Sequence, residues 1–169
     1  IEITFDKVYD FIYTASGDPH KNHDTLINAL IILAKQGHYP SLALTLDVGK
    51  YQCLLTRVEE VKNKYGLKIY NLGWVEKKEI LRESYLKSTF LVYPSKLESF
   101  GVPLIEANNY GLPIIASELD YVRDVCDPIA TFNPDSPMSI ARAIKRALSI
   151  PSEPIRILDS KTFIQNVMA

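Results

Sequence analysis

The amino-acid sequence predicts an α/β protein with a Rossmann-like parallel sheet and helices on both faces of that sheet. Short β-prone apolar runs alternate with longer stretches of helical periodicity along most of the chain. This alternation is typical of βαβ units, in which successive strands run parallel. The 169 residues are 47% hydrophobic and 23% charged, which is enough to bury the core of one globular domain.

Six strands are predicted from apolar and β-branched runs that turn residues bound on either side. They cover residues 11–15, 42–48, 67–72, 89–93, 113–117 and 129–132. The carboxyl ends of parallel strands share one edge of a sheet, where ligands bind near the switch in strand order. The loops 14–22, 73–76 and 94–102 each follow a strand, so we expect them to meet at that edge.

Six helices are predicted from apolar residues that recur every three or four positions. They cover residues 22–36, 52–65, 76–87, 102–110, 121–126 and 137–148. Asn22 and Ser136 are the expected N-caps of the first and last of these helices. The tail could hold one more helix from Lys161, capped by Ser160.

The chain is expected to divide into a linker remnant at residues 1–9, a ligand-binding domain at 10–150 and a tail at 151–169. The opening residues read like the end of a linker, which suggests a piece of a longer protein. No apolar run approaches the ~20 residues that a membrane span needs. We therefore expect a cytoplasmic protein, held at the inner face of the membrane only if a part outside this chain brings it there.

Charge and cysteine usage exclude some classes of protein. Lys and Arg number 19 and Asp and Glu number 20, so the net charge is -1 and nothing indicates nucleic acid as a partner. Cys53 and Cys126 are far apart in the sequence, and we expect buried thiols in a reducing compartment. His20 and His23 lack a third ligand nearby, so no metal site is predicted.

The richest group of candidates lies in YPSKLESFGVPLIEA, residues 93–107. A strand ends here and a polar loop leads into a helix that begins near Val102, followed by a Pro that suits the first turn. Glu98 precedes this helix and Glu106 lies about one turn inside it. A helix N-terminus attracts phosphate, and carboxylates accept hydrogen bonds from sugar hydroxyls. Gly101 between the two Glu lets a ligand approach the backbone closely.

A second candidate is the loop that follows the first predicted strand. Lys21 lies just before a helix N-terminus, in the loop that also contains Ser16 and Gly17. A Lys at this place meets a diphosphate as a point charge while the helix amides hold it. Two other phosphate motifs are absent: Gly49-Lys50 does not complete a Walker A loop, and no G-x-G-x-x-G follows the first strand. The latter argues against a dinucleotide-dependent oxidoreductase.

The segment ESFGVPLIEA resembles the Glu-x7-Glu signature of family 4 glycosyltransferases, and the resemblance covers about residues 10–150. It implies the C-terminal, donor-binding half of a GT-B fold, with retaining and metal-independent transfer from a nucleotide sugar. We expect a UDP-sugar as donor, no further cofactor, and a bacterial surface-polysaccharide or O-antigen pathway. The acceptor, a saccharide or lipid-linked saccharide, would bind an N-terminal domain that the chain lacks, so the chain alone is expected not to turn over.

The resemblance also implies roles for individual residues. Glu98 lies near the donor sugar, Glu106 accepts hydrogen bonds from the ribose, and Lys21 stabilises the diphosphate leaving group. The other residues implied in donor binding are Ser99, Phe100, Gly101 and Val102 through their backbone, Trp74 and Val75 at the base, and Ser16 and Gly17 in the Lys21 loop. Family members often carry an Arg in that loop, which keeps open a non-catalytic nucleotide-binding or regulatory α/β domain.

Overall fold

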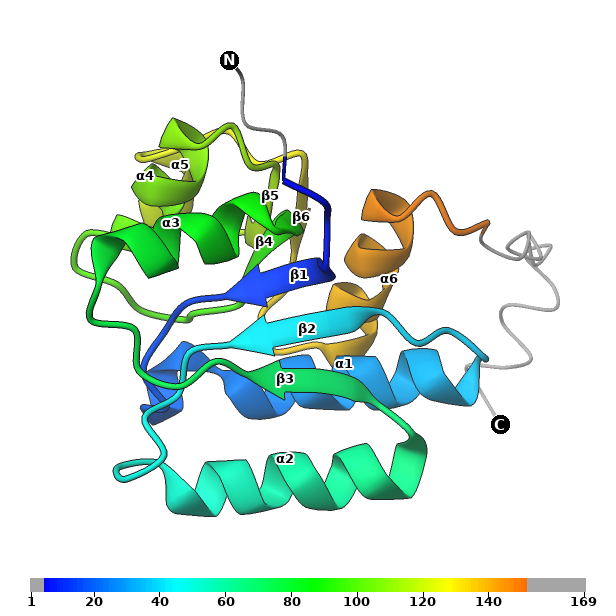
Figure 1. The fold of residues 1–169 in the computed structure, drawn as a ribbon. Helices are drawn as coiled ribbons and strands as arrows, with labels where there is room; N and C mark the ends of the chain where they lie inside the picture. Colours follow the sequence, from blue (N-terminus) through cyan, green and yellow to red (C-terminus); the bar gives the residue numbers. More distant parts are fainter. Residues whose placement is uncertain (1–4, 152–169) are drawn as a thin grey trace, which may run out of the picture.

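The computed structural model describes residues 5–151 and contains a six-stranded sheet between two layers of helices (Figure 1). The strand order is β3-β2-β1-β4-β5-β6. Every neighbouring pair of strands is parallel. The chain adds strands in one direction from β1 to β3 and then returns to add β4 on the other side of β1. The switch in strand order therefore lies between β1 and β4, and the predicted fold class is confirmed.

The elements alternate as the sequence pattern predicts. The strands are β1 (Tyr9–Tyr13), β2 (Ser41–Leu44), β3 (Lys68–Asn71), β4 (Ser88–Tyr93), β5 (Ile114–Ser117) and β6 (Ala130–Phe132). The α-helices are α1 (His23–Lys35), α2 (Gln52–Tyr65), α3 (Lys78–Leu86), α4 (Val102–Asn109), α5 (Asp120–Arg123) and α6 (Pro137–Ala147), and a 3-10 turn, η1 (Pro19–Lys21), precedes α1.

The helices cover both faces of the sheet. Helices α1, α2 and α6 lie on one face, where α1 packs against both of the others, and α3, α4 and α5 lie on the other face (Figure 1). The predicted apolar stripe of α1 is confirmed, since Leu26, Ala29, Leu30 and Leu33 are at most 3% exposed. Burying a Leu side chain contributes ~1.5–3 kcal/mol. Residues 11–13 of β1 and 91–93 of β4 are at most 1% exposed, so both strands at the switch point are buried at their carboxyl ends.

The first two strands end earlier than the sequence pattern predicts. β1 ends at Tyr13 rather than Ala15, and β2 ends at Leu44 rather than at residue 48. Leu46 is fully buried, but its main-chain N–H and C=O bond to the side-chain amide of Asn71, at 2.9 Å each. The apolar run thus extends beyond the last residue of β2, because side chains are still buried where the backbone no longer pairs with a neighbouring strand.

The helix caps are partly as predicted. The Ser136 side chain accepts a hydrogen bond from the Ser139 N–H at 3.1 Å, which confirms it as the cap of α6. Asn22 occupies the N-cap position of α1, but its side chain makes no cap hydrogen bond and its backbone is left-handed, with φ 63°. Helices α3 and α5 begin and end within two or three residues of their predicted bounds. The helix predicted from Lys161 lies outside the described residues.

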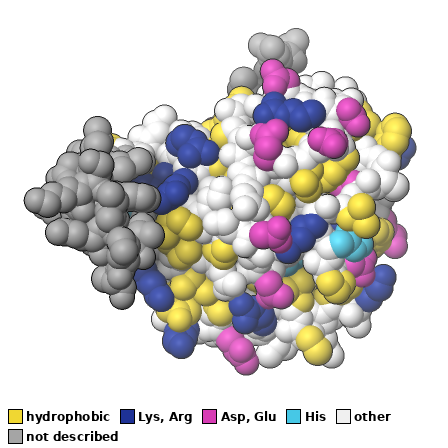
Figure 2. Space-filling model, turned by 180° about the vertical axis from the view of Figure 1, so that it is seen from behind, with side chains coloured by type: hydrophobic (Ala, Val, Ile, Leu, Met, Phe, Trp, Pro, Cys, Tyr) yellow, Lys and Arg dark blue, Asp and Glu magenta, His cyan; other side chains and the backbone are white. Residues whose placement is uncertain are grey.

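The surface gives two further results. Cys53 is exposed and Cys126 is half-buried, so the prediction of two buried thiols is wrong for Cys53, which lies at the solvent-facing start of α2. On the face seen in Figure 2, Lys and Arg side chains lie among Asp and Glu side chains without forming a continuous basic stripe. Within residues 5–151, no helix has the length and apolar character that crossing a membrane requires.

Candidate functional site

The candidate site is built from loops at the carboxyl edge of the sheet, on either side of the switch point. The β1–α1 loop and the β4–α4 loop are joined there by two hydrogen bonds: the Lys96 N–H and the Ser95 hydroxyl both donate to the carbonyl of His20, at 2.9 and 3.3 Å. The Asn22 amide adds a third link by donating to the carbonyl of Pro94 at 3.0 Å. The predicted meeting of these two loops is therefore confirmed.

Lys21 and Glu98 lie together at this place, although 77 residues separate them in the chain. The Lys21 Nζ is 2.6 Å from the Glu98 Oε1, and the two side chains are 16% and 9% exposed. The Tyr93 hydroxyl donates to the same carboxylate oxygen at 2.7 Å. The Tyr13 hydroxyl donates to the main-chain carbonyl of Lys21 at 2.7 Å. Both predicted catalytic residues are thus held in fixed positions by tyrosines from the two central strands.

The surroundings of Glu98 favour its charged form. Burial alone would raise the pKa of Glu98, but the hydrogen bonds to the carboxylate and the charge of Lys21 outweigh burial, so the pKa is lowered. Burial and the Glu98 carboxylate together raise the pKa of Tyr93, which therefore stays protonated and acts as a donor. Glu98 is an acceptor of hydrogen bonds at neutral pH, and a ligand hydroxyl beside it would be the donor.

Glu106 lines a different hollow, which the first residues of the β1–α1 loop also line. A cavity of about 170 Å³ is lined by Thr14, Ala15, Ser16, Thr45, Trp74, Val75, Leu81, Pro103 and Glu106. It brings together four of the predicted site residues, from the ends of β1 and β3 and from α4. Trp74 is 63% exposed, so its ring is available for stacking. Glu106 is the only charged residue in this lining.

The residues between the two Glu contribute mainly backbone. Ser99 lines a shallow groove with His20, Lys21, Leu97 and Glu98. The side chains of Phe100 and Val102 are 66% and 52% exposed. Gly101 has φ +65°, and a Cβ there would meet the side chain of Leu104 at 3.1 Å, so this N-cap of α4 requires glycine. Within residues 5–151, the N–H groups of Ser99, Phe100 and Gly101 donate no hydrogen bond, which leaves them free for an anionic ligand.

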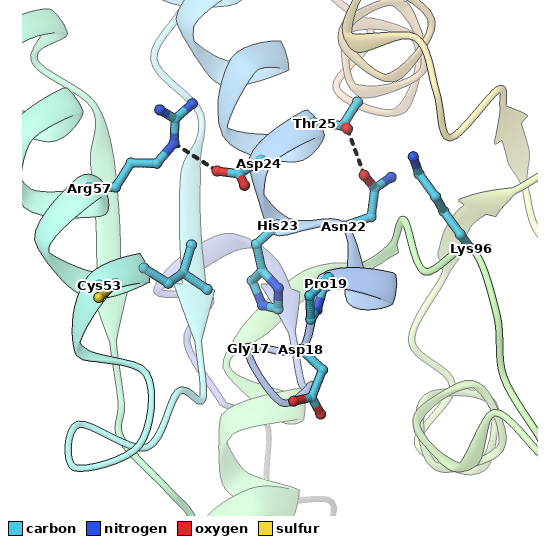
Figure 3. Close-up of a pocket in the computed structure, with 11 residues that line it drawn as sticks. Gly17, Asp18, Pro19, Asn22, His23, Asp24, Thr25, Cys53, Arg57 and Lys96 are labelled. Atoms are coloured by element: carbon cyan, nitrogen blue, oxygen red, sulfur yellow. Dashed lines mark hydrogen bonds and ion pairs between the residues drawn. The ribbon is translucent and has the colours of Figure 1, made fainter.

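Gly17 lies apart from Ser16, in a third hollow. This cavity, about 500 Å³, opens between the N-terminal ends of α1 and α2 (Figure 3). A Cβ on Gly17 would lie 2.5 Å from the ring of Tyr51, so the close packing of Tyr51 accounts for the glycine. Asp24 and Arg57 form an ion pair across the cavity, at 2.7 Å (Figure 3). The predicted neighbours Ser16 and Gly17 thus face different cavities.

His23 is a buried member of this third cavity. It is 4% exposed, its ring packs on Tyr13 at 4.8 Å between centroids, and neither ring nitrogen has a hydrogen-bond partner. Burial, together with the nearby charge of Lys21, lowers the pKa of His23 to about 4. His23 is therefore neutral at pH 7 and acts as a packing residue. In the described part of the chain, no group of three or more His, Cys, Asp or Glu side chains could hold a metal ion.

Sequence reasoning missed the residues that hold Glu106 from behind. Tyr85 donates to the Glu106 Oε2 at 2.9 Å, and Thr14 bonds to Tyr85 at 2.7 Å. Tyr85 comes from α3 and Thr14 from the end of β1, so no motif contains them. In the sequence, Tyr85 appears only as a tyrosine on the inner face of a predicted helix, where a core residue is expected.

These features define a class of protein: a doubly wound α/β domain with a half-buried Lys, two carboxylates and free backbone amides near the switch point. A family model described as "Glycosyl transferases group 1" matches residues 2–161. The chain therefore belongs to this glycosyltransferase family. The resemblance to family 4 glycosyltransferases with a GT-B fold is confirmed.

Relatives and solved structures agree with this assignment. The chain is 39% identical over 153 residues to the O-antigen chain mannosyltransferase RfbU of Salmonella typhimurium, a match that covers 83% of this chain and 39% of that protein. It is 28% identical over 143 residues to the serotype-specific mannosyltransferase WbdA of Escherichia coli, covering 83% of this chain and 17% of WbdA. The chain thus spans between 17% and 39% of the length of these curated relatives.

Solved structures show the same fold. A glycosyltransferase from Rickettsia africae superposes with a TM-score of 0.69 at 22% identity, over 84% of this chain and 38% of that one. Anabaena HepE, solved in complex with UDP and glucose, superposes with a TM-score of 0.64 at 18% identity, over 83% of this chain and 39% of that one. In both cases the likeness covers less than half of the solved chain.

Proposed function

We propose that this chain is the donor-binding domain of a glycosyltransferase that transfers a sugar from a nucleoside diphosphate sugar to a saccharide or lipid-linked acceptor. The observation that carries the proposal is the contact between Lys21 and Glu98 at the switch point, together with the Glu106 cavity that the start of the same loop lines. A nucleotide sugar needs three groups: a cation for the diphosphate, one carboxylate for the sugar and another for the ribose.

In the proposed mechanism, each group has one task. The diphosphate lies against Lys21 and the free N–H groups of residues 99–101, which stabilise the charge that develops as the sugar leaves. Glu98 orients the donor sugar through its hydroxyls. Glu106 accepts a hydrogen bond from the ribose, and Trp74 and Val75 contact the base. Transfer is retaining, and positive charge from the protein serves the diphosphate without a metal.

A UDP-sugar is the favoured donor. HepE, which shares this fold, was solved with UDP and glucose, whereas RfbU and WbdA are named mannosyltransferases. The cavity beside Glu106 has no charged residue other than Glu106, so base selection there would depend on stacking and backbone contacts. No single side chain therefore identifies the nucleotide base, and a titration with different nucleotides is needed to identify it.

Calorimetric titration with UDP, GDP and ADP tests the proposal. We expect one of them to bind, and Lys21→Ala and Glu106→Ala to weaken that binding by about 10-fold or more, the effect of losing a charge-assisted hydrogen bond. Lys68→Ala is the matched control, because Lys68 is an exposed Lys at the opposite end of β3. If no nucleotide bound, or if all three variants behaved alike, the proposal would be wrong.

A second function has one observation in its favour. Lys21 is the only cation among residues 14–22, where Ser16 and Gly17 stand in place of the Arg common in the family, and it is already paired with Glu98. A nucleotide-binding or regulatory domain without catalysis would need no second cation. An assay for sugar transfer and for donor hydrolysis by the full-length protein separates the two, because binding without either activity would favour the regulatory domain.

A further inference from the structure

A buried chain of hydroxyl groups leads from the end of β1 to the carboxylate of Glu106. The Thr14 Oγ1 lies 2.7 Å from the Tyr85 hydroxyl, and that hydroxyl lies 2.9 Å from the Glu106 Oε2. Tyr85 is 0% exposed and Thr14 is 7% exposed. The three residues come from α3, from the β1–α1 loop and from α4, so the contact ties together three separate parts of the fold.

The direction of these hydrogen bonds follows from their chemistry. An ionised carboxylate only accepts, so the Tyr85 hydroxyl donates its single proton to Glu106. Burial, and to a lesser extent the charge of Glu106, raise the pKa of Tyr85, so the hydroxyl keeps that proton. The Tyr85 oxygen is then left to accept from Thr14. All the hydrogens in the chain point toward Glu106, and the carboxylate cannot turn without breaking it.

The other oxygen of Glu106 is in a different situation. Within residues 5–151, Glu106 Oε1 has no hydrogen-bond partner and Glu106 forms no ion pair, although its side chain lines the cavity of about 170 Å³. An acceptor fixed at one end and free at the other suits a ligand that presents a hydroxyl group at a defined position. A flexible, solvent-exposed Glu would lose side-chain entropy on making the same contact.

We propose that Tyr85, supported by Thr14, is a positioning residue that fixes the Glu106 carboxylate to recognise the ribose hydroxyls of the nucleotide, and so makes the site selective for ribonucleotides over deoxyribonucleotides. The inference rests on the proposed function, because it requires a nucleotide in the Glu106 cavity. It goes further by assigning a task to a residue outside the Glu-x7-Glu segment.

The test compares ligands as well as variants. The full chain is titrated with whichever of UDP, GDP and ADP binds most tightly, and with the 2′-deoxy and 3′-deoxy forms of that nucleotide. In the unaltered protein we expect at least one deoxy form to bind about 10-fold more weakly. In Tyr85→Phe the ratio of the affinity for the ribonucleotide to the affinity for that deoxy form should fall to about 2-fold, because the free carboxylate oxygen is no longer held in place. Thr14→Val should lower the same ratio less.

A ratio of affinities separates positioning from folding. A variant that is partly unfolded loses apparent affinity for both ligands equally, so the ratio does not change. Tyr110→Phe is the control, because the Tyr110 ring packs on Tyr85 at 5.6 Å between centroids and should leave the ratio unaltered. If Tyr85→Phe kept the full ratio, the inference would be overturned while the proposed function stood. If no nucleotide bound to the unaltered chain, the proposed function and this inference would both be wrong.

Discussion

Glu98 and Glu106 differ in what surrounds them, although both are held by a tyrosine hydroxyl. Glu98 shares one oxygen between Tyr93 and the ammonium of Lys21, so its charge is compensated within the protein. Glu106 is held by Tyr85 alone, and no ion pair among residues 5–151 includes it. The Glu-x7-Glu segment thus provides two kinds of hydrogen-bond acceptor. Glu98 is a paired carboxylate beside the proposed diphosphate position, and Glu106 is an unpaired carboxylate that can accept a hydrogen bond from a neutral hydroxyl.

The largest expected effect comes from removing the cation. In the unaltered protein the Glu98 side chain is 9% exposed and paired with Lys21. Lys21→Met removes this counter-charge, and we expect a loss of about 2 kcal/mol in the free energy of unfolding. Nucleotide affinity should fall by about 10- to 100-fold, because a charge-assisted contact is lost. Urea unfolding and calorimetry measure the two effects.

The double variant Lys21→Met/Glu98→Gln checks that prediction. It should regain most of the stability, because no unpaired charge remains, and it should not regain affinity. Recovery of both properties would show that Lys21 has no part in nucleotide binding. Unchanged stability in the single variant would show that the ion pair contributes nothing to the fold.

A smaller effect separates the two carboxylates directly. Glu98→Gln should destabilise by about 1–2 kcal/mol, because Lys21 then lacks a counter-charge. Glu106→Gln should change stability by less than about 0.5 kcal/mol, because the amide oxygen still accepts from Tyr85. Unfolding curves measured side by side decide this. Equal losses in the two variants would mean that the surroundings of the two Glu are energetically alike.

The smallest expected effect concerns pH. The pKa of His23 is lowered to about 4 from an ordinary value near 6.5, so the folded state binds fewer protons than the unfolded state between these values. Its contribution to stability is complete above about pH 6.5 and is lost as pH falls toward 4. Between pH 7.5 and 5.5 we expect a loss of about 1 kcal/mol, and His23→Leu should remove most of it.

Glu98 provides the internal comparison for this experiment. Its pKa is lowered, so its contribution is complete above the ordinary Glu value of about 4.3 and is lost only as pH falls through the lower value in the folded state. A loss of stability between pH 7.5 and 5.5 that persisted in His23→Leu would have to come from some other group.

The sequence was sufficient for the order of the elements and for placing the loops that carry Lys21 and Glu98 at one edge of the sheet. Hydrophobic periodicity is a local argument and the switch-point rule is a topological one, so neither needs the contacts of single side chains. It was not sufficient for contacts made by single side chains over long distances. Tyr85 reads as core on a helix, and Cys53 reads as a buried thiol, until the fold places one against Glu106 and the other at the surface. For the same reason, the sequence could not show that Ser16 and Gly17 line different cavities.

Asn22 shows how such a contact governs mutational tolerance. Its amide group donates to the carbonyls of Pro94 and Pro134, at 3.0 and 2.7 Å, and its oxygen accepts from Thr25 at 2.6 Å. Its left-handed backbone is one that Asn adopts more readily than most residues. Replacing it would loosen three loops at once, so saturation mutagenesis should find position 22 nearly invariant, even though the proposal places no ligand atom against it.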